Sequence, residues 1–159
     1  MSLLPLVCAA AIATGACDNN NGVGRISTAP TVAAFVIVSP SLINLTALGG
    51  FNCPGQGFSP SFNLIVTANG SSRSMSAATF TLIDGTTVGG PSVTVPSSQL
   101  SSQFGSTVIV GGTSRSFAMQ PIFSCPGIPI VTPQAMRATV VLADAQGREE
   151  SLSTTVSFR

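Results

Sequence analysis

Short apolar segments, separated by Gly, Pro, Asn and Ser residues, run through the chain from about Ala33 to its end. Within several of these segments apolar and polar residues alternate, which is typical of strands with one buried face. No segment keeps the 3.6-residue period of an amphipathic helix. The pattern predicts an all-β protein in which about seven to nine short antiparallel strands form a sandwich or barrel.

The strand candidates fall into a longer and a shorter set. The longer ones are Ala33–Val38, Leu42–Ala47, Ser61–Ala68 and Ala77–Ile83. In the third, one face is expected to carry Phe62, Leu64, Val66 and Ala68, and in the fourth, Ala78, Phe80 and Leu82. The shorter ones are Ser92–Val95, Thr107–Val110 and Ser116–Phe123. Pro121 interrupts the last of these, which predicts an edge or bulged strand because proline lacks the N–H that a central strand needs.

The last part of the chain has the clearest pattern. Arg137–Ala143 and Glu150–Phe158 flank the turn-forming residues 144–147, which predicts a β-hairpin. In the final segment Leu152, Thr154, Val156 and Phe158 share one face. With this hairpin, the body of the chain resembles the immunoglobulin-like modules of bacterial surface proteins. The resemblance implies an immunoglobulin-like sandwich over residues 33–159.

The chain begins with a leader-like segment. Leu3–Ile12 is an apolar run of about ten residues, about half of what a helix needs to cross a bilayer. It fits the apolar region of a signal peptide, which we place at residues 1–16. Residues 17–32 are polar and glycine-rich at their start, and we expect them to form a flexible tether.

Gly15-Ala16-Cys17 places small residues directly before a cysteine. This resembles the lipobox of bacterial lipoproteins, which implies a lipid on Cys17 and a membrane-anchored protein at the periplasmic or cell surface. The alternative is an ordinary secretory signal, cleaved near Ala16, that leaves Cys17 free in a secreted protein.

Two further cysteines, Cys53 and Cys125, have matching surroundings. Each follows a nearby aromatic residue and precedes Pro-Gly, so each is expected where a strand passes into a loop. An exported chain meets an oxidising compartment, and we therefore predict a Cys53–Cys125 disulfide. A redox pair or a metal site is the alternative, but reactive dithiols favour C-x-x-C spacing and zinc needs four ligands.

The missing residue types limit the chemistry that the chain can perform. There is no His and no Lys, so the commonest general base, the commonest metal ligand and the Schiff-base amine are all missing. We expect no catalytic, cofactor-binding or metal-binding residues, and a core role for Met75, Met119 and Met136. The scattered arginines and net charge of +1 predict no nucleic-acid binding.

These features predict a non-enzymatic lipoprotein of the cell envelope, which acts as a structural or protein-interaction module. Its partners would be the membrane, through Cys17, and a protein that the sequence does not identify. Two alternatives stay open. One is a carrier of small apolar ligands with a cavity inside the sandwich, and the other is a subunit of an extracellular assembly.

Overall fold

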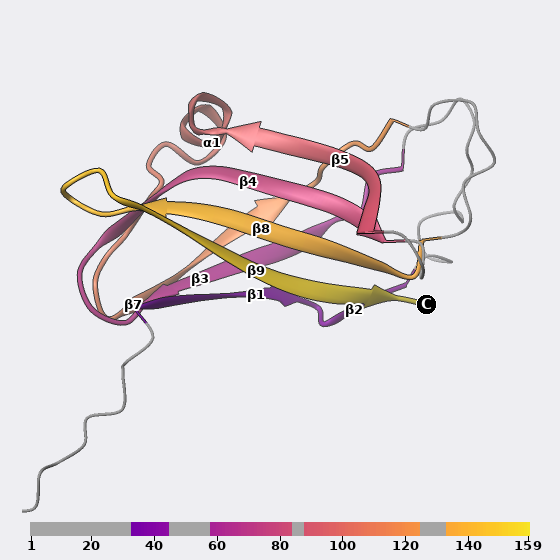
Figure 1. Ribbon diagram of the computed structural model, residues 1–159, viewed down its shortest axis with the longest axis horizontal. Helices are drawn as coiled ribbons and strands as arrows, with labels where there is room; N and C mark the ends of the chain where they lie inside the picture. Colours follow the sequence, from indigo (N-terminus) through magenta and orange to yellow (C-terminus); the bar gives the residue numbers. More distant parts are fainter. Residues whose placement is uncertain (1–32, 45–57, 84–87, 125–132) are drawn as a thin grey trace, which may run out of the picture. The chain divides into compact units, whose positions relative to one another are not determined.

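The apolar faces expected from the sequence meet between two β-sheets in a computed structural model of the chain (Figure 1). The structure describes residues 33–44, 58–83, 88–124 and 133–159. All of them lie in one compact unit, Thr31–Arg159. The described part is mostly β-structure with one helix, which confirms the all-β prediction.

The smaller sheet has three antiparallel strands in the order β1-β3-β7. The strands are β1 (Ala34–Ser39), β3 (Phe62–Ala68) and β7 (Thr113–Met119). In β3 the predicted face is confirmed, because Phe62, Leu64, Val66 and Ala68 are all buried. Alternate residues of β1 are buried in the same way. One face of this sheet therefore carries its apolar side chains into the interior.

The larger sheet has the order β2-β9-β8-β4-β5, and β6 also pairs with β4. Its strands are β2 (Leu42–Ile43), β4 (Arg73–Ile83), β5 (Val88–Pro96), β6 (Val108–Ile109), β8 (Ala135–Ala143) and β9 (Glu149–Phe158). β2 pairs with β9 in parallel, whereas the other pairs in this sheet are antiparallel. β1 and β2 are neighbours along the chain, on either side of the cis Ser39–Pro40 bond, yet they belong to different sheets.

Side chains from both sheets form one core. The ring of Phe62 on β3 lies 5.2 Å from that of Phe80 on β4, in an edge-to-face arrangement that joins the two layers. Met75, Met119 and Met136 are buried, as expected of core residues. The described residues contribute no buried polar or charged residue to this interior.

The sequence, in which no segment keeps a helical period, did not reveal the helix α1 (Ser97–Phe104), which lies between β5 and β6 along the chain. Pro96 precedes α1, and Gly105, with a φ of 73°, ends it by donating its N–H to the Ser101 carbonyl. Leu100 is fully buried, and the Phe104 ring lies 5.2 Å from that of Phe117 on β7. Packing against the sandwich therefore stabilises this short polar helix.

Two strand boundaries also differ from the prediction. β7 ends at Met119, so Pro121 follows the strand and does not interrupt it. β2 contains Leu42 and Ile43, whereas residues 45–47 of the predicted strand lie outside the described residues.

The predicted hairpin is confirmed as β8 and β9, and Asp144 organises its turn. One carboxylate oxygen accepts hydrogen bonds from the N–H groups of Gln146 and Arg148, both at 2.9 Å. The other lies 2.7 Å from the Arg148 guanidinium and 3.8 Å from that of Arg73. The backbone hydrogen bond from Arg148 is the main cause that lowers the pKa of Asp144. The turn therefore favours the charged carboxylate.

The lowered pKa of Asp144 predicts a loss of stability in acid. A carboxyl group whose pKa is lower in the folded state stabilises the protein above its unfolded pKa, about 3.9, and ceases to do so as the pH falls through the folded value. We expect Asp144→Asn to lower the melting temperature at neutral pH and to flatten its decline below about pH 4. Thermal unfolding followed by circular dichroism at several pH values measures both effects.

Glu150→Gln is the matched control for this prediction, because it removes a neighbouring carboxylate without touching the hydrogen bonds of the turn. If Asp144→Asn and the wild type lose stability in parallel as the pH falls, the assigned role of Asp144 is incorrect.

Candidate functional site

The three cysteines singled out in the sequence, Cys17, Cys53 and Cys125, lie outside the described residues. The structure does describe the chain near two of them. Phe58 and Phe123 form an antiparallel bridge in which each N–H donates to the other's carbonyl, at 3.2 and 2.8 Å. Phe58 follows Cys53 by five positions, and Phe123 precedes Cys125 by two. The chain is thus drawn together a few residues from both cysteines.

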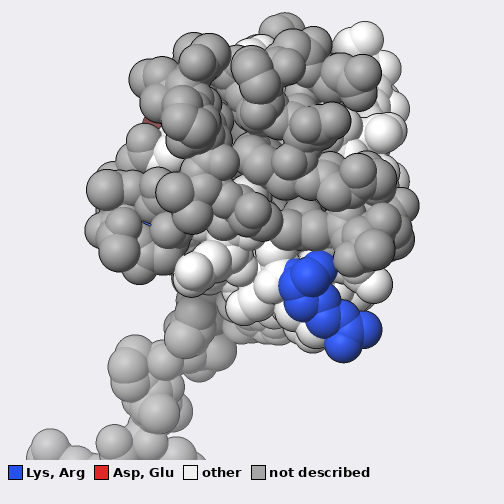
Figure 2. Space-filling view, turned by 90° about the vertical axis from the view of Figure 1, so that its right-hand side faces the viewer, with Lys and Arg blue, Asp and Glu red and all other residues white. Residues whose placement is uncertain are grey.

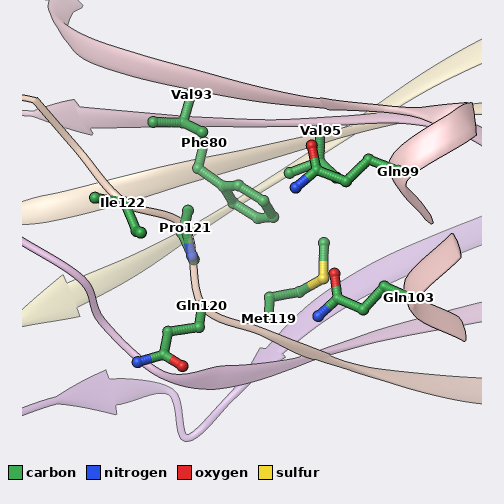
Figure 3. Close-up of a pocket in the computed structure, with 9 residues that line it drawn as sticks. All are labelled: Phe80, Val93, Val95, Gln99, Gln103, Met119, Gln120, Pro121 and Ile122. Carbon is green, nitrogen blue, oxygen red and sulfur yellow. The ribbon is translucent and has the colours of Figure 1, made fainter.

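A small pocket opens where β5 of the larger sheet and β7 of the smaller sheet lie near each other (Figure 3). We call it the edge pocket, and its volume is about 210 Å³. Its lining comes from β4, β5, α1, the end of β7 and the residues after β7. These residues are Phe80, Val93, Val95, Gln99, Gln103, Met119, Gln120, Pro121 and Ile122.

The floor of the edge pocket is apolar. Phe80, Val95 and Met119 are all buried, because each stands at an inward position of its strand. Ile122 lies at the rim and is 65% exposed. In Figure 3 the Phe80 ring and the Met119 side chain point into the space between the two sheets. The pocket therefore offers an apolar surface that is open to a partner from one side.

Three glutamines surround this floor. Gln99 and Gln103 are four residues apart on α1 and so lie on one face of the helix, while Gln120 follows β7 (Figure 3). The Gln103 amide donates to the Ala118 carbonyl at 3.4 Å. Each glutamine amide contains both a donor and an acceptor, as does a peptide group. The rim can therefore exchange hydrogen bonds with a peptide backbone.

Arg115 on β7 binds the end of α1, the helix that forms one side of the edge pocket. Its guanidinium donates to the carbonyls of Val108 at 2.9 Å and Phe104 at 3.3 Å. It also lies over the Phe117 ring, 5.0 Å from the centroid. These contacts hold both ends of the segment between α1 and β6 against the smaller sheet.

A second, shallower hollow adjoins the edge pocket and shares Gln103, Met119 and Gln120 with it. Its volume is about 350 Å³. The rest of its lining comes from the end of β1, the start of β3 and β7. These residues are Ser39, Pro40, Ser61, Phe62, Asn63 and Ala118. The recessed surface thus continues from the edge pocket toward the end of the smaller sheet.

Neither hollow is lined by a charged residue. Figure 2 shows one face of the molecule, on which a single group of basic side chains lies among uncharged described residues. Asp144 is engaged in its hairpin turn, and Glu149 accepts a hydrogen bond from the Ser76 hydroxyl at 3.2 Å.

Across the described ranges, no three potential metal ligands of the His, Cys, Asp and Glu types form a group. No helix among these residues is long and apolar enough to span a membrane.

Comparison with known proteins assigns no family to the chain. No family model matches it, and no curated protein does. Among solved structures, the alkylpurine DNA glycosylase AlkC of Pseudomonas fluorescens, bound to DNA containing an abasic site analog, is 14% identical with a TM-score of 0.35. The match covers 80% of this chain and 31% of that chain. A likeness of this size supports no conclusion about fold or activity.

Proposed function

We propose that this protein is a non-enzymatic interaction module with an immunoglobulin-like sandwich, anchored to the cell envelope through a lipid on Cys17. Its edge pocket binds an uncharged, extended segment of a partner protein. The observation that carries the proposal is the composition of this pocket, an apolar floor surrounded by three glutamine amides without a charged residue.

Strand order supports the immunoglobulin-like assignment. Such sandwiches place the first, second, fourth and fifth strands in one sheet and the third, sixth and seventh in the other. β1, β3 and β7 match the first, second and fifth strands, and β4, β8 and β9 match the third, sixth and seventh. The remaining strand, β5, lies beside β4 at the edge of the larger sheet instead of in the smaller one. The first strand is divided between the two sheets: its first part, β1, pairs with β3, and its second part, β2, pairs with β9.

The size of the edge pocket favours a protein partner over a small carried ligand. Pockets that enclose a small molecule have volumes of about 300–1,000 Å³. The edge pocket, at about 210 Å³, is below this range and suits one apolar side chain of a partner. The adjoining hollow of about 350 Å³ is shallow and extends the recess along the surface, as a segment of a partner chain requires. An ionised side chain would lose its hydration there without gaining a counter-charge, so the bound segment is uncharged.

We expect Ile122→Asp to weaken binding to the edge pocket by about tenfold or more, because it places a charge at the apolar rim. The probe is a displayed library of random heptapeptides, selected on the full chain. The peptides enriched on the wild type are expected to be uncharged and to contain a central apolar residue. Their affinities for the wild type and the variant are then compared by titration.

Val110→Asp is the matched control. Val110 is 59% exposed, similar to Ile122, but it does not line the pocket. The variant should bind the selected peptides as the wild type does. Enrichment of charged peptides, equal loss of binding in both variants, or no loss in Ile122→Asp would each contradict the proposed site.

The membrane anchor is supported by the small residues before Cys17 and by the apolar segment that precedes them. We expect metabolic labelling with a palmitate analogue to mark the protein in a bacterial host, and Cys17→Ala to abolish the label. Cys8→Ala, which changes a cysteine within the apolar segment, should leave labelling unchanged. An unlabelled wild type, or a labelled Cys17→Ala variant, would exclude this anchor.

A further inference from the structure

The outer edge of β1 presents unused backbone hydrogen-bonding groups. The Asn69 N–H donates to the Ala33 carbonyl, and β1 and β3 keep one antiparallel register from Ala34 opposite Ala68 onward. In such a ladder hydrogen-bonded and non-hydrogen-bonded pairs alternate. Ala34, Val36 and Val38 therefore direct their N–H and C=O groups away from β3. Within the described part of the chain, no hydrogen bond reaches these outward groups.

Among the described residues, the outer edges of β5, β7 and β2 are interrupted, engaged or short, whereas β1 pairs with β3 alone and lies beside β9 without a backbone hydrogen bond to it. β5 contains Pro91 and Pro96, which lack an N–H, and prolines of this kind protect strand edges. β7 has the Gln103 amide bonded to its Ala118 carbonyl. β2 is only two residues long. β1 has six residues, Ala34–Ser39, with neither a proline nor a charged residue among them.

The solvent-facing side chains of β1 are also unusual. Phe35 and Ile37 are 43% and 45% exposed, and both project from the outer face of the smaller sheet. Exposed apolar residues on an unprotected edge strand favour pairing with another strand. The backbone and the side chains of β1 therefore point to the same kind of partner.

We infer that two copies of this protein associate through antiparallel pairing of their β1 strands, with the two-fold axis at Val36. In this register Val36 lies opposite Val36 of the second copy, and Ala34 lies opposite its Val38. These are the residues whose backbone groups point outward, so the hydrogen bonds are made between them. The two small sheets become one continuous sheet.

The same register explains why the occupant is a second copy. Phe35 lies opposite Ile37 of the second copy, in a non-hydrogen-bonded pair where side chains approach most closely. The symmetry repeats this contact, so that both exposed apolar residues of each copy are covered. Because β1 carries no charged residue, a second copy introduces no like-charge repulsion across the new pair.

Two charge variants with the same loss of apolar surface test the pairing. Phe35→Lys with Ile37→Lys places two lysines opposite each other twice, whereas Phe35→Lys with Ile37→Glu places lysine opposite glutamate twice. We expect the full-length wild type and the Lys/Glu variant to form dimers in sedimentation equilibrium. The Lys/Lys variant should dissociate at a concentration about tenfold higher or more. All three proteins are studied in the same detergent buffer, with circular dichroism to verify folding.

A monomeric wild type would overturn the inference. Equal dimer stability of the Lys/Lys and Lys/Glu variants, whether high or low, would also overturn it. The two variants differ only in which charges the antiparallel register places opposite each other. Hydrogen exchange of the wild type gives a second test that needs no substitution. The amides of Ala34, Val36 and Val38 should lose protection on dilution, while those of the neighbouring β3 strand should keep theirs. Protection that does not depend on concentration would contradict the pairing.

Discussion

Replacing Phe80 with alanine is expected to lower the free energy of unfolding by about 3–5 kcal/mol. Phe80 is fully buried on β4, which pairs with both β5 and β8. Its ring packs edge to face against Phe62 of the opposite sheet at 5.2 Å. Truncation removes this contact and leaves a cavity between two sheets whose paired strands cannot easily close around it. Urea denaturation followed by circular dichroism gives the change in free energy.

Val110→Ala is the control for Phe80→Ala. Val110 is 59% exposed and lies outside both sheets, so its truncation should change the free energy of unfolding by about 0.5 kcal/mol or less. A loss below about 1.5 kcal/mol for Phe80→Ala would mean that the two sheets do not share a tightly packed core at this position. Because Phe80 also forms the floor of the edge pocket, its variants test folding, whereas Ile122→Asp tests binding.

The strands that alternate most regularly were predicted well from the sequence. In Ser61–Ala68 and Ala77–Ile83 the residues expected to share a buried face do so in β3 and β4. The hairpin of β8 and β9 was also placed correctly, since both its strands and its turn are encoded by neighbouring residues. Such local patterns suffice because successive side chains of a strand point to opposite faces.

α1 could not be predicted in the same way. Its apolar residues are Leu100 and Phe104, which are four positions apart, and the rest of the segment is Ser and Gln. A helix of eight residues is only marginally stable alone and depends on tertiary contacts. Those contacts are made with β4 and β5 and, through Phe104, with Phe117 and Arg115 on β7, and no local pattern in the sequence connects these strands to the helix.

The edge pocket was missed for a related reason. Its floor combines Phe80 with Met119, and its rim takes Gln103 from the unpredicted helix. No spacing in the sequence connects these positions, because the partition of strands between two sheets brings them together. The available signal was Pro121-Ile122, where a proline followed by an apolar residue interrupts the predicted strand Ser116–Phe123. The exposed face of β1 was equally hidden, since AAFVIV contains apolar residues at both inward and outward positions.

Loss of the proposed Cys53–Cys125 disulfide, whose cysteines lie a few positions along the chain from the Phe58–Phe123 bridge, is expected to lower the stability of the protein strongly. We expect Cys53→Ala to lower the free energy of unfolding by about 4 kcal/mol, because the bond closes a loop of about seventy residues in the unfolded chain. The short distances along the chain from Phe58 to Cys53 and from Phe123 to Cys125 support this pairing. Urea denaturation without reductant measures the change.

The double variant decides whether the two sulfurs act as one unit. If they are joined, Cys53→Ala, Cys125→Ala and the double substitution each break the same bond, so all three should lose about the same 4 kcal/mol. Two separately packed thiols would instead give losses that add in the double variant. Mass spectrometry after alkylation, with and without prior reduction, provides the chemical control. Alkylation of both thiols in unreduced native protein would contradict the disulfide, whatever the stability of the variants.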